Sequence, residues 1–270
     1  MAALDPAALR AALAESASGR LDRIETFDEI DSTNSYLASQ PPPDPGRGHV
    51  ALADHQTAGR GRHGNQWRSI PGRSLCLSMA YRFETTPGEL PALTLSQGAA
   101  IVSALAALGA QGLRLKWPND ILHGDAKLGG ILTETQVRAA DNVTVVTGVG
   151  VNLAPVEVDL SAGGWSGAVS SLDAATSEGP DQLRVAVGVI ESMVDTFATF
   201  AEHGFAAFHD AYVRHDALLG RSIEIDTPEG ELEGTVRGVD TTGALLLDTD
   251  GSTARVVTGS IRRLVEPASA

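Results

Sequence analysis

A segment rich in arginine and glycine is the first part of this sequence whose residue types point to chemistry. Residues 55–68 read HQTAGRGRHGNQWR and contain three glycines, three arginines and one tryptophan. Glycine lets the backbone approach a ligand closely, and the arginine guanidinium offers planar paired donors that match phosphate or carboxylate. This composition predicts a loop that binds an anion.

Two other interpretations of this segment were weighed. Residues 59–64 match the G-x-G-x-x-G dinucleotide fingerprint, which we reject because Pro71, Gly72 and a strand-like run follow where a helix is required. A solvated surface loop is the simpler alternative. Trp67 argues against it, because a large apolar side chain needs something to cover. We expect the loop to order over the anion and to exclude water from a reactive intermediate.

Two lysines on neighbouring strand-like runs form a second candidate site. Residues 115–134 read LKWPNDILHGDAKLGGILTE, in which Lys116 and Lys127 flank a turn set by Pro118. The functional interpretation is that two cations meet a ligand carboxylate or phosphate. The alternative is an ordinary strand pair whose lysines extend to solvent.

These segments together resemble the signatures of biotin protein ligases. The resemblance rests on GRGRHGNQW, KWPND and KLGGIL followed by Glu134, and extends to DSTN at 31–34 and GVGVNL at 148–153. It implies a two-step reaction: biotin and MgATP give biotinyl-5′-adenylate and pyrophosphate, and a lysine of a biotin carboxyl carrier domain of acyl-CoA carboxylases then takes the biotin. ATP, Mg²⁺ and biotin are thus the implied small molecules.

The resemblance also implies roles for individual residues. The biotin-binding residues would be Ser32, Thr33, Asn34, Gln56, Arg60, Gly61, Arg62 and Lys127. ATP and the adenylate would be held by Arg60, Arg62, Trp67, Lys116, Asn119, Gly150 and Asn152. Catalysis would depend on Lys127, Arg62 and Asp120, with Asp120 also helping to organise Mg²⁺ and phosphate. The cations would offset the repulsion between an anionic carboxylate and an anionic phosphate.

Hydrophobic periodicity indicates the elements that must position these residues. Helices are expected at 6–16, 32–39, 88–108, 181–201 and 204–215, and strands at 21–30, 49–54, 74–83, 112–117, 119–123, 128–137 and 143–153. Loops are expected at 40–48, 55–73 and 154–180, and Asp31 or Ser32 is expected to cap the second helix. From 216 onward, short apolar runs alternate with turn signals, which is typical of a small β domain.

We therefore predict an α+β fold with two domains. With the resemblance, residues 1–215 are expected to form a class II synthetase-like biotin ligase catalytic domain with a mixed sheet and flanking helices. Residues 216–270 are expected to form a small SH3-like β-barrel.

Composition excludes several other classes of protein. The net charge of −14 argues against a general nucleic-acid binder. The single cysteine, Cys76, allows no intrachain disulfide and is expected to be a buried, inert thiol. No histidine pair has zinc-ligand spacing, and we expect neither bound zinc nor a membrane span, but a cytoplasmic protein.

The sequence leaves two alternative functions and the oligomeric state open. A lipoate or octanoate transferase would share the fold type, and a non-catalytic biotin-sensing regulator is a further alternative. Too few residues precede the catalytic segments for a helix-turn-helix domain, so we expect a monofunctional ligase without DNA-binding activity. Both a monomer and a homodimer are compatible with the sequence.

Overall fold

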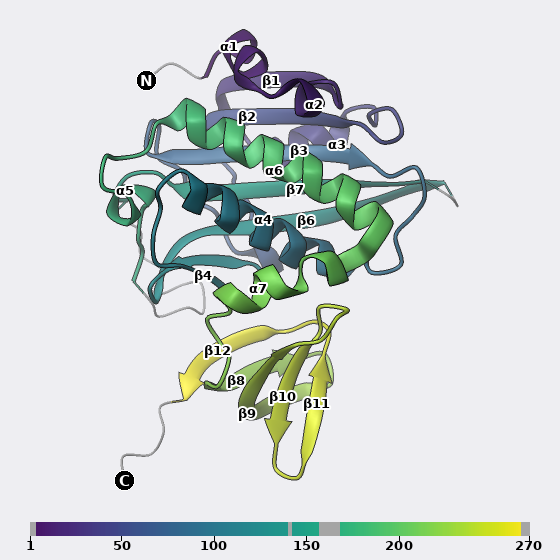
Figure 1. Cartoon of the computed structure of the whole chain (residues 1–270), viewed down its shortest axis with the longest axis vertical. Coiled ribbons are helices and arrows are strands. Elements are labelled where there is room, and N and C mark those ends of the chain that lie inside the picture. Colours follow the sequence, from purple (N-terminus) through teal and green to yellow (C-terminus); the bar gives the residue numbers. More distant parts are fainter. Residues whose placement is uncertain (1–3, 140–141, 157–167, 266–270) are drawn as a thin grey trace.

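A seven-stranded mixed sheet forms the centre of the larger part of the chain (Figure 1). The computed structural model describes residues 4–139, 142–156 and 168–265. Only the first pair of strands is parallel, and every other pair is antiparallel. Across the sheet the order is β1 (Leu21–Ile30), β2 (Gly48–Gln56), β3 (Ser74–Arg82), β7 (Asn142–Asn152), β6 (Ala126–Ala139), β5 (Asp120–His123) and β4 (Leu113–Lys116).

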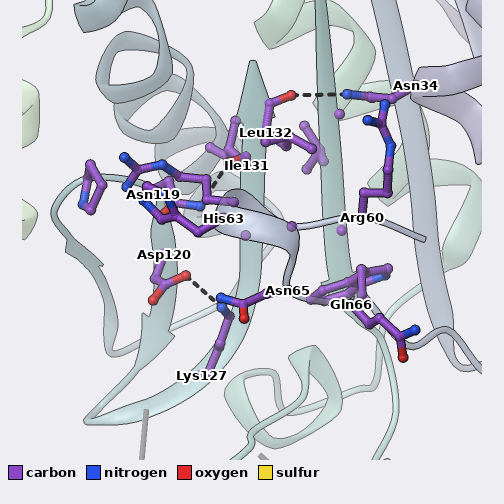
Figure 2. Close-up of a pocket in the computed structure, with 18 of the residues that line it drawn as sticks. Asn34, Arg60, His63, Asn65, Gln66, Asn119, Asp120, Lys127, Ile131 and Leu132 are labelled. Carbon is purple, nitrogen blue, oxygen red and sulfur yellow. Dashed lines mark hydrogen bonds and ion pairs between the residues drawn. The ribbon is translucent and has the colours of Figure 1, made fainter. Parts of the chain in front are cut away.

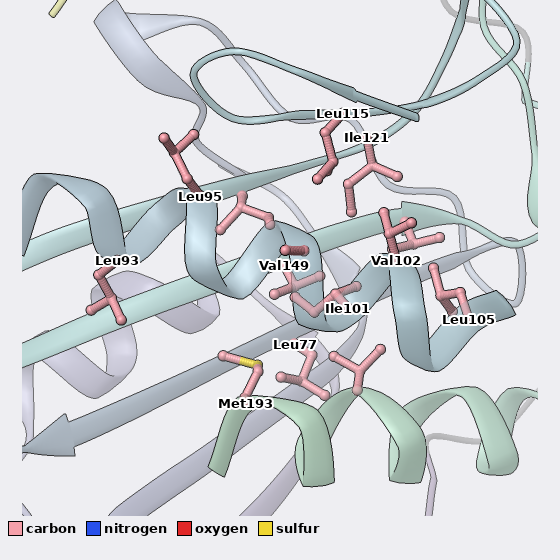
Figure 3. Packing of buried hydrophobic residues seen from close by; sticks show 14 of the residues in the cluster. Leu77, Leu93, Leu95, Ile101, Val102, Leu105, Leu115, Ile121, Val149 and Met193 are labelled. Carbon is pink, nitrogen blue, oxygen red and sulfur yellow. The ribbon is translucent and has the colours of Figure 1, made fainter. Parts of the chain in front are cut away.

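Helices cover both faces of this sheet. Strand residues alternate between the faces, so Ala51 and Val146 contact α3 (Thr33–Ser39), whereas their neighbours Val50 and Val145 belong to the main core. That core lies under α4 (Leu93–Ala107) and α6 (Gln182–His203), which cross the front of the sheet in Figure 1. Figure 3 shows leucine, isoleucine and valine side chains of α4 and the strands packed together beside Met193 of α6.

Shorter helices complete the larger part. Within the described residues they are α1 (Pro6–Ala12), α2 (Glu15–Ser18), α5 (Leu172–Ala175), α7 (His209–His215) and the 3₁₀ turns at Arg62–Gly64, Leu90–Ala92 and Gly204–Ala207. The helix predicted over 6–16 is two helices, because the backbone is extended at Leu13 and the N–H of Ala14 donates to Glu191 of α6 at 2.7 Å. The middle of the loop predicted at 154–180 lies outside the described residues.

One helix region is long and apolar because much of it lies in the core. The window Leu90–Ala107 is long and apolar enough, with a mean hydropathy of 1.5, to satisfy the length and composition of a membrane span. In the fold 56% of that window is buried inside the protein, against the sheet and α6. Its apolar character is therefore explained by its place in the core.

A second, five-stranded antiparallel sheet follows α7. Its order is β11 (Ser252–Val256), β10 (Leu245–Thr249), β9 (Gly230–Val239), β8 (Ser222–Thr227) and β12 (Ser260–Val265). It is tied to the large sheet by the buried indole N–H of Trp117, which donates to the carbonyl of Gly243 at 3.2 Å, and by the N–H of Ala217, which donates to Leu115 at 2.8 Å. The mixed sheet, the flanking helices and the small β unit confirm the predicted fold class.

Candidate active site

A cavity on the α3 face of the large sheet brings together residues from nearly the whole length of the chain. It encloses about 1020 Å³ of empty space, its open mouth included. Figure 2 shows lining residues of α3, the arginine-glycine loop and the strands around it. The predicted site residues that line it are Ser32, Thr33, Asn34, Gln56, Arg60, Gly61, Arg62, Trp67, Lys116, Asn119, Asp120, Lys127 and Gly150.

One end of the cavity, called the uncharged end below, is built on the start of α3 and presents mainly uncharged polar groups; the two charged side chains there, Arg60 and Glu134, form an ion pair with each other. Ser32 caps this helix, because its side chain accepts from the N–H of Ser35. The free N–H of Thr33 in the first turn donates to the Oε1 of Gln56 at 2.7 Å. Gln56 lies at the end of β2, and Ser69 accepts from its backbone N–H. Helix capping thus fixes hydroxyl and amide groups at this end.

Asn34 lies at the uncharged end, against the middle of β7. Its Nδ2 donates to Glu134 at 2.8 Å, and its Oδ1 accepts from Ser78 at 2.6 Å. A Cβ at position 148 would lie 2.3 Å from Asn34 Oδ1, so only glycine admits this side chain. Neither Ser78 nor Glu134 was among the predicted site residues, although Glu134 belongs to the motif that carried the resemblance.

The arginine-glycine loop folds across the cavity. Arg60 forms an ion pair with Glu134 at 2.8 Å, and its backbone forms a bridge with Gln66. The ring of Trp67 lies against Gly150 of β7, where an added Cβ would be 2.4 Å from the indole. Only glycine at position 150 therefore leaves room for the Trp67 ring against β7.

The other end of the cavity is charged and centres on Asp120. Lys127 Nζ lies 2.7 Å from Asp120 Oδ1, and Lys116 Nζ lies 3.4 Å from Asp120 Oδ2. Burial alone would raise the pKa of Asp120, but the two lysines outweigh it and hold that pKa below its usual value. Burial lowers the pKa of Lys116 to about 8; Lys127 adds to this shift and Asp120 opposes it. Two lysines are thus held beside one carboxylate, with net positive charge below pH 8.

Arg62 adds a third cation and joins this end to the small β domain. Burial lowers its pKa, and the charge of Asp120 opposes that shift. Its guanidinium donates to the carbonyl of Gly259 at 3.3 Å. Ser260 and Ile261 of β12 line the same cavity. No signal in the sequence linked these distant residues to the loop, because only the packing of the two sheets brings them there.

The two predicted asparagines have different positions. Asn119 lines the cavity, and its Nδ2 donates to the carbonyl of Ile131 at 3.0 Å, which fixes the turn between β4 and β5. Asn152 is not part of the lining. It is buried, and its Nδ2 donates to the carbonyl of Ser170 at 3.1 Å, so the structure places it where it holds the end of β7. The structure therefore does not bring Asn152 to the ligand cavity.

A direct magnesium site on Asp120 does not fit these residues. Both carboxylate oxygens are engaged by lysines, and the described residues contain no group of three or more His, Cys, Asp or Glu side chains placed to hold a metal ion. The expected role of Asp120, which is to organise Mg²⁺ through the phosphates, stays a prediction; in the described residues its carboxylate contacts Lys116 and Lys127.

Cys76 agrees with its prediction as a buried thiol. It lies in β3 with 2% of its surface exposed, and burial raises the pKa of the thiol to about 11. A neutral thiol at physiological pH is a poor nucleophile.

Comparisons with known proteins define the class to which this fold and cavity belong. The profile of the Biotin/lipoate A/B protein ligase family matches residues 26–152, and that of the Biotin protein ligase C terminal domain matches residues 218–262. The chain is similar to the bifunctional ligase/repressor BirA of Escherichia coli, with 34% identity over 86% of this chain and 72% of that protein.

A relative of similar length matches nearly the whole chain. The biotin--[acetyl-CoA-carboxylase] ligase of Mycobacterium tuberculosis is 32% identical over 97% of this chain and 96% of that protein. The biotin protein ligase of Aquifex aeolicus, solved in complex with biotin and ATP, superposes with a TM-score of 0.75 at 25% identity, over 90% of this chain and 99% of that one. The chain belongs to the biotin protein ligase family.

Proposed function

We propose that this protein is an ATP-dependent ligase that activates biotin and transfers it to a lysine of an acyl-CoA carboxylase carrier domain. In the first step a biotin carboxylate oxygen attacks the α-phosphorus of ATP, and pyrophosphate leaves. In the second step the acceptor amine attacks the carbonyl of the mixed anhydride, loses a proton and releases AMP. The names of the Mycobacterium and Aquifex relatives, which mention the carboxylase, biotin and ATP, support this assignment.

The observation that carries the proposal is the polarity of the cavity along its length. An uncharged hydrogen-bonding end at Thr33 and Asn34 suits the ureido ring of biotin, and a cationic end at Lys127 and Arg62 suits its carboxylate and the phosphates. Ligand pockets combine an apolar wall with a few placed polar groups in this way. A single ligand with a neutral ring and a carboxylate would span the two ends.

The charged end supplies the catalysis, which consists of positioning and electrostatics. Lys127 and Arg62 would hold the biotin carboxylate and the α-phosphate together, and Lys116 and Asn119 would bind the polyphosphate. Asp120 keeps both lysine ammonium groups at fixed positions, 2.7 Å and 3.4 Å from its oxygens. Donors held in advance stabilise developing charge without reorganising during the reaction.

The loop supplies closure at the uncharged end. Ser32, Thr33 and Gln56 would contact the ureido ring, and Arg60 and Gly61 would cover it. Trp67, seated on Gly150, would form a wall of the adenylate site. Excluding water matters because the acyl-phosphate anhydride hydrolyses readily when exposed. We place this reaction in the cytoplasm. We also propose that residues 1–215 form the catalytic domain and that residues 216–270 form the small C-terminal β domain.

One assay tests the proposal directly. The protein is incubated with labelled biotin, MgATP and a biotin carrier domain, and both pyrophosphate release and label on the carrier lysine are measured. Absence of both refutes the proposal. Label from lipoate in place of biotin would indicate the lipoate transferase reaction, and adenylate formation without transfer would indicate a sensor. The Lys127→Ala variant is expected to abolish adenylate formation, and Arg10→Ala, in α1, serves as its control.

A further inference from the structure

A continuous chain of hydrogen bonds runs beneath the uncharged end of the cavity. Glu134 accepts from Asn34 at 2.8 Å, and Ser78 donates to Asn34 at 2.6 Å. Ser78 Oγ also lies 2.6 Å from Thr33 Oγ1, and the Thr33 N–H reaches Gln56 at 2.7 Å. The side chains in this series of hydrogen bonds come from three separate strands and one helix. Thr33, Asn34 and Ser78 are each no more than 5% exposed.

Hydrogen-bond chemistry fixes the direction of this chain from the Glu134 end. A carboxylate and a backbone carbonyl only accept, so the atom of Asn34 that faces Glu134 and the Leu132 carbonyl must be the amide nitrogen. Asn34 Oδ1 therefore faces Ser78, and the Ser78 hydroxyl must donate to it (Figure 2 shows the Asn34 to Leu132 contact). The partners of the Asn34 side chain therefore fix the orientation of its amide group.

The direction continues from Ser78 to Thr33. A hydroxyl has one proton, and that of Ser78 is given to Asn34. In the 2.6 Å contact between the two hydroxyls, Thr33 is therefore the donor and Ser78 the acceptor. Gln56 Oε1, 3.0 Å from the same Thr33 oxygen, is a second acceptor within reach of that proton and already accepts from the Thr33 N–H. Thr33 Oγ1 then has lone pairs, and no proton, for a ligand in the cavity that it lines.

We infer that Ser78 and Glu134 are positioning residues that make Thr33 a hydrogen-bond acceptor toward the ligand and so set the selectivity of the uncharged end for a ring that carries N–H donors. This inference rests on the proposed function. The ureido ring of biotin has two N–H groups that can donate to Thr33. A dithiolane ring has none, so it would leave the buried oxygen of Thr33 without a donor, which is costly.

The first test removes the middle of the chain. In Ser78→Ala, Asn34 Oδ1 loses its donor, and the Thr33 hydroxyl loses one of its two acceptors and keeps only Gln56 Oε1, at 3.0 Å. We expect the KM for biotin in pyrophosphate release to rise about 10- to 100-fold, the range for an unsatisfied buried polar group, with the KM for ATP unchanged. Ser74→Ala is the matched control, because Ser74 lies in the same strand, is fully buried and hydrogen-bonds only the loop N–H of Ile70 among the contacts described.

The second test exchanges donor and acceptor at the Glu134 end. Asn34→Asp places a second carboxylate opposite Glu134, whose own charge is paired with Arg60 at 2.8 Å. The variant is expected to raise the biotin KM at least about tenfold at pH 8, because the introduced carboxylate cannot donate to Glu134 or to the Leu132 carbonyl and repels the Glu134 carboxylate. Lowering the pH to 6 should partly restore binding, because a proton shared between the two carboxylates lets the introduced side chain donate again. The double variant Asn34→Asp/Glu134→Gln restores a donor opposite an acceptor and leaves an oxygen facing Ser78; because it also removes the carboxylate that pairs with Arg60, it is compared with Glu134→Gln alone. It should regain most of the lost affinity and lose the pH dependence.

The outcomes distinguish a failure of the proposed function from a failure of the role assigned to Ser78 and Glu134. A wild-type protein without biotin-dependent pyrophosphate release refutes the proposed function itself. An active wild type in which Ser78→Ala and Ser74→Ala have the same biotin KM refutes the role of Ser78. An active wild type in which the double variant is no better than Asn34→Asp refutes the direction assigned to the chain. Thermal melting of each variant confirms that it is folded before its kinetics are compared.

Discussion

The charged end of the cavity predicts an alkaline limit to ATP use that belongs to a single lysine. Lys116 is 7% exposed, and burial lowers its pKa to about 8, compared with 10.5 for a free lysine. Its positive charge is present below pH 8 and is lost as the pH rises through that value. If the charged form binds the polyphosphate, kcat/KM for ATP should be level near pH 7, fall about twofold by pH 8 and fall about tenfold by pH 9, one pH unit above the pKa.

The assay is pyrophosphate release without a carrier domain, which isolates the first step from deprotonation of the acceptor lysine. The perturbation is Lys116→Arg, because an arginine stays protonated far above pH 9. Its absolute rate is expected to be lower, since the guanidinium does not fit an ammonium site, but the fall between pH 8 and 9 should disappear. A wild-type profile that is level to pH 9.5, or a fall that persists in Lys116→Arg, would show that another group titrates.

Three further outcomes follow from the packing. Gly150→Val should displace the Trp67 ring, which an added Cβ would approach to 2.4 Å, and raise the KM for biotin and ATP at least about tenfold by the loss of orientation; Gly88→Ala, with no atom within 4 Å, should leave both unchanged. Trp117→Phe removes the donor to the carbonyl in the turn between β9 and β10, and urea unfolding should report a loss of about 1–3 kcal/mol. Cys76, with its thiol pKa near 11, should resist a thiol reagent at pH 8 in the native protein and react after denaturation.

Local patterns in the sequence were enough for most of the elements. The strand over residues 21–30, the helix at 33–39 with Ser32 as its cap, and the loop between β2 and β3 all lie where periodicity and turn residues placed them. These features depend on interactions between residues close in the chain, so their signals are local. The first helix was an exception, since a contact of Ala14 with Glu191 ends it, and that partner is 177 residues away.

The sequence also indicated which residue types would meet a ligand. Arginine and glycine in the loop and the lysines of β4 and β6 belong to one cavity, as their motifs predicted. Their partners were not predictable in the same way. That Asp120 is held by two lysines, and that Arg62 reaches Gly259 beside β12, depends on which strands pair and how the two sheets pack.

Tertiary structure alone decided the roles of the side chains that hold the site. Ser78 is one of many buried residues in a strand that has no motif, and Asn152 lies in a motif but bonds Ser170 and does not line the cavity. Side chains in a strand face opposite sides at every step, so the face that a residue takes follows from register. Register is set by pairing between distant segments, and it is this pairing that converts a resemblance in residue types into a particular biotin-binding geometry.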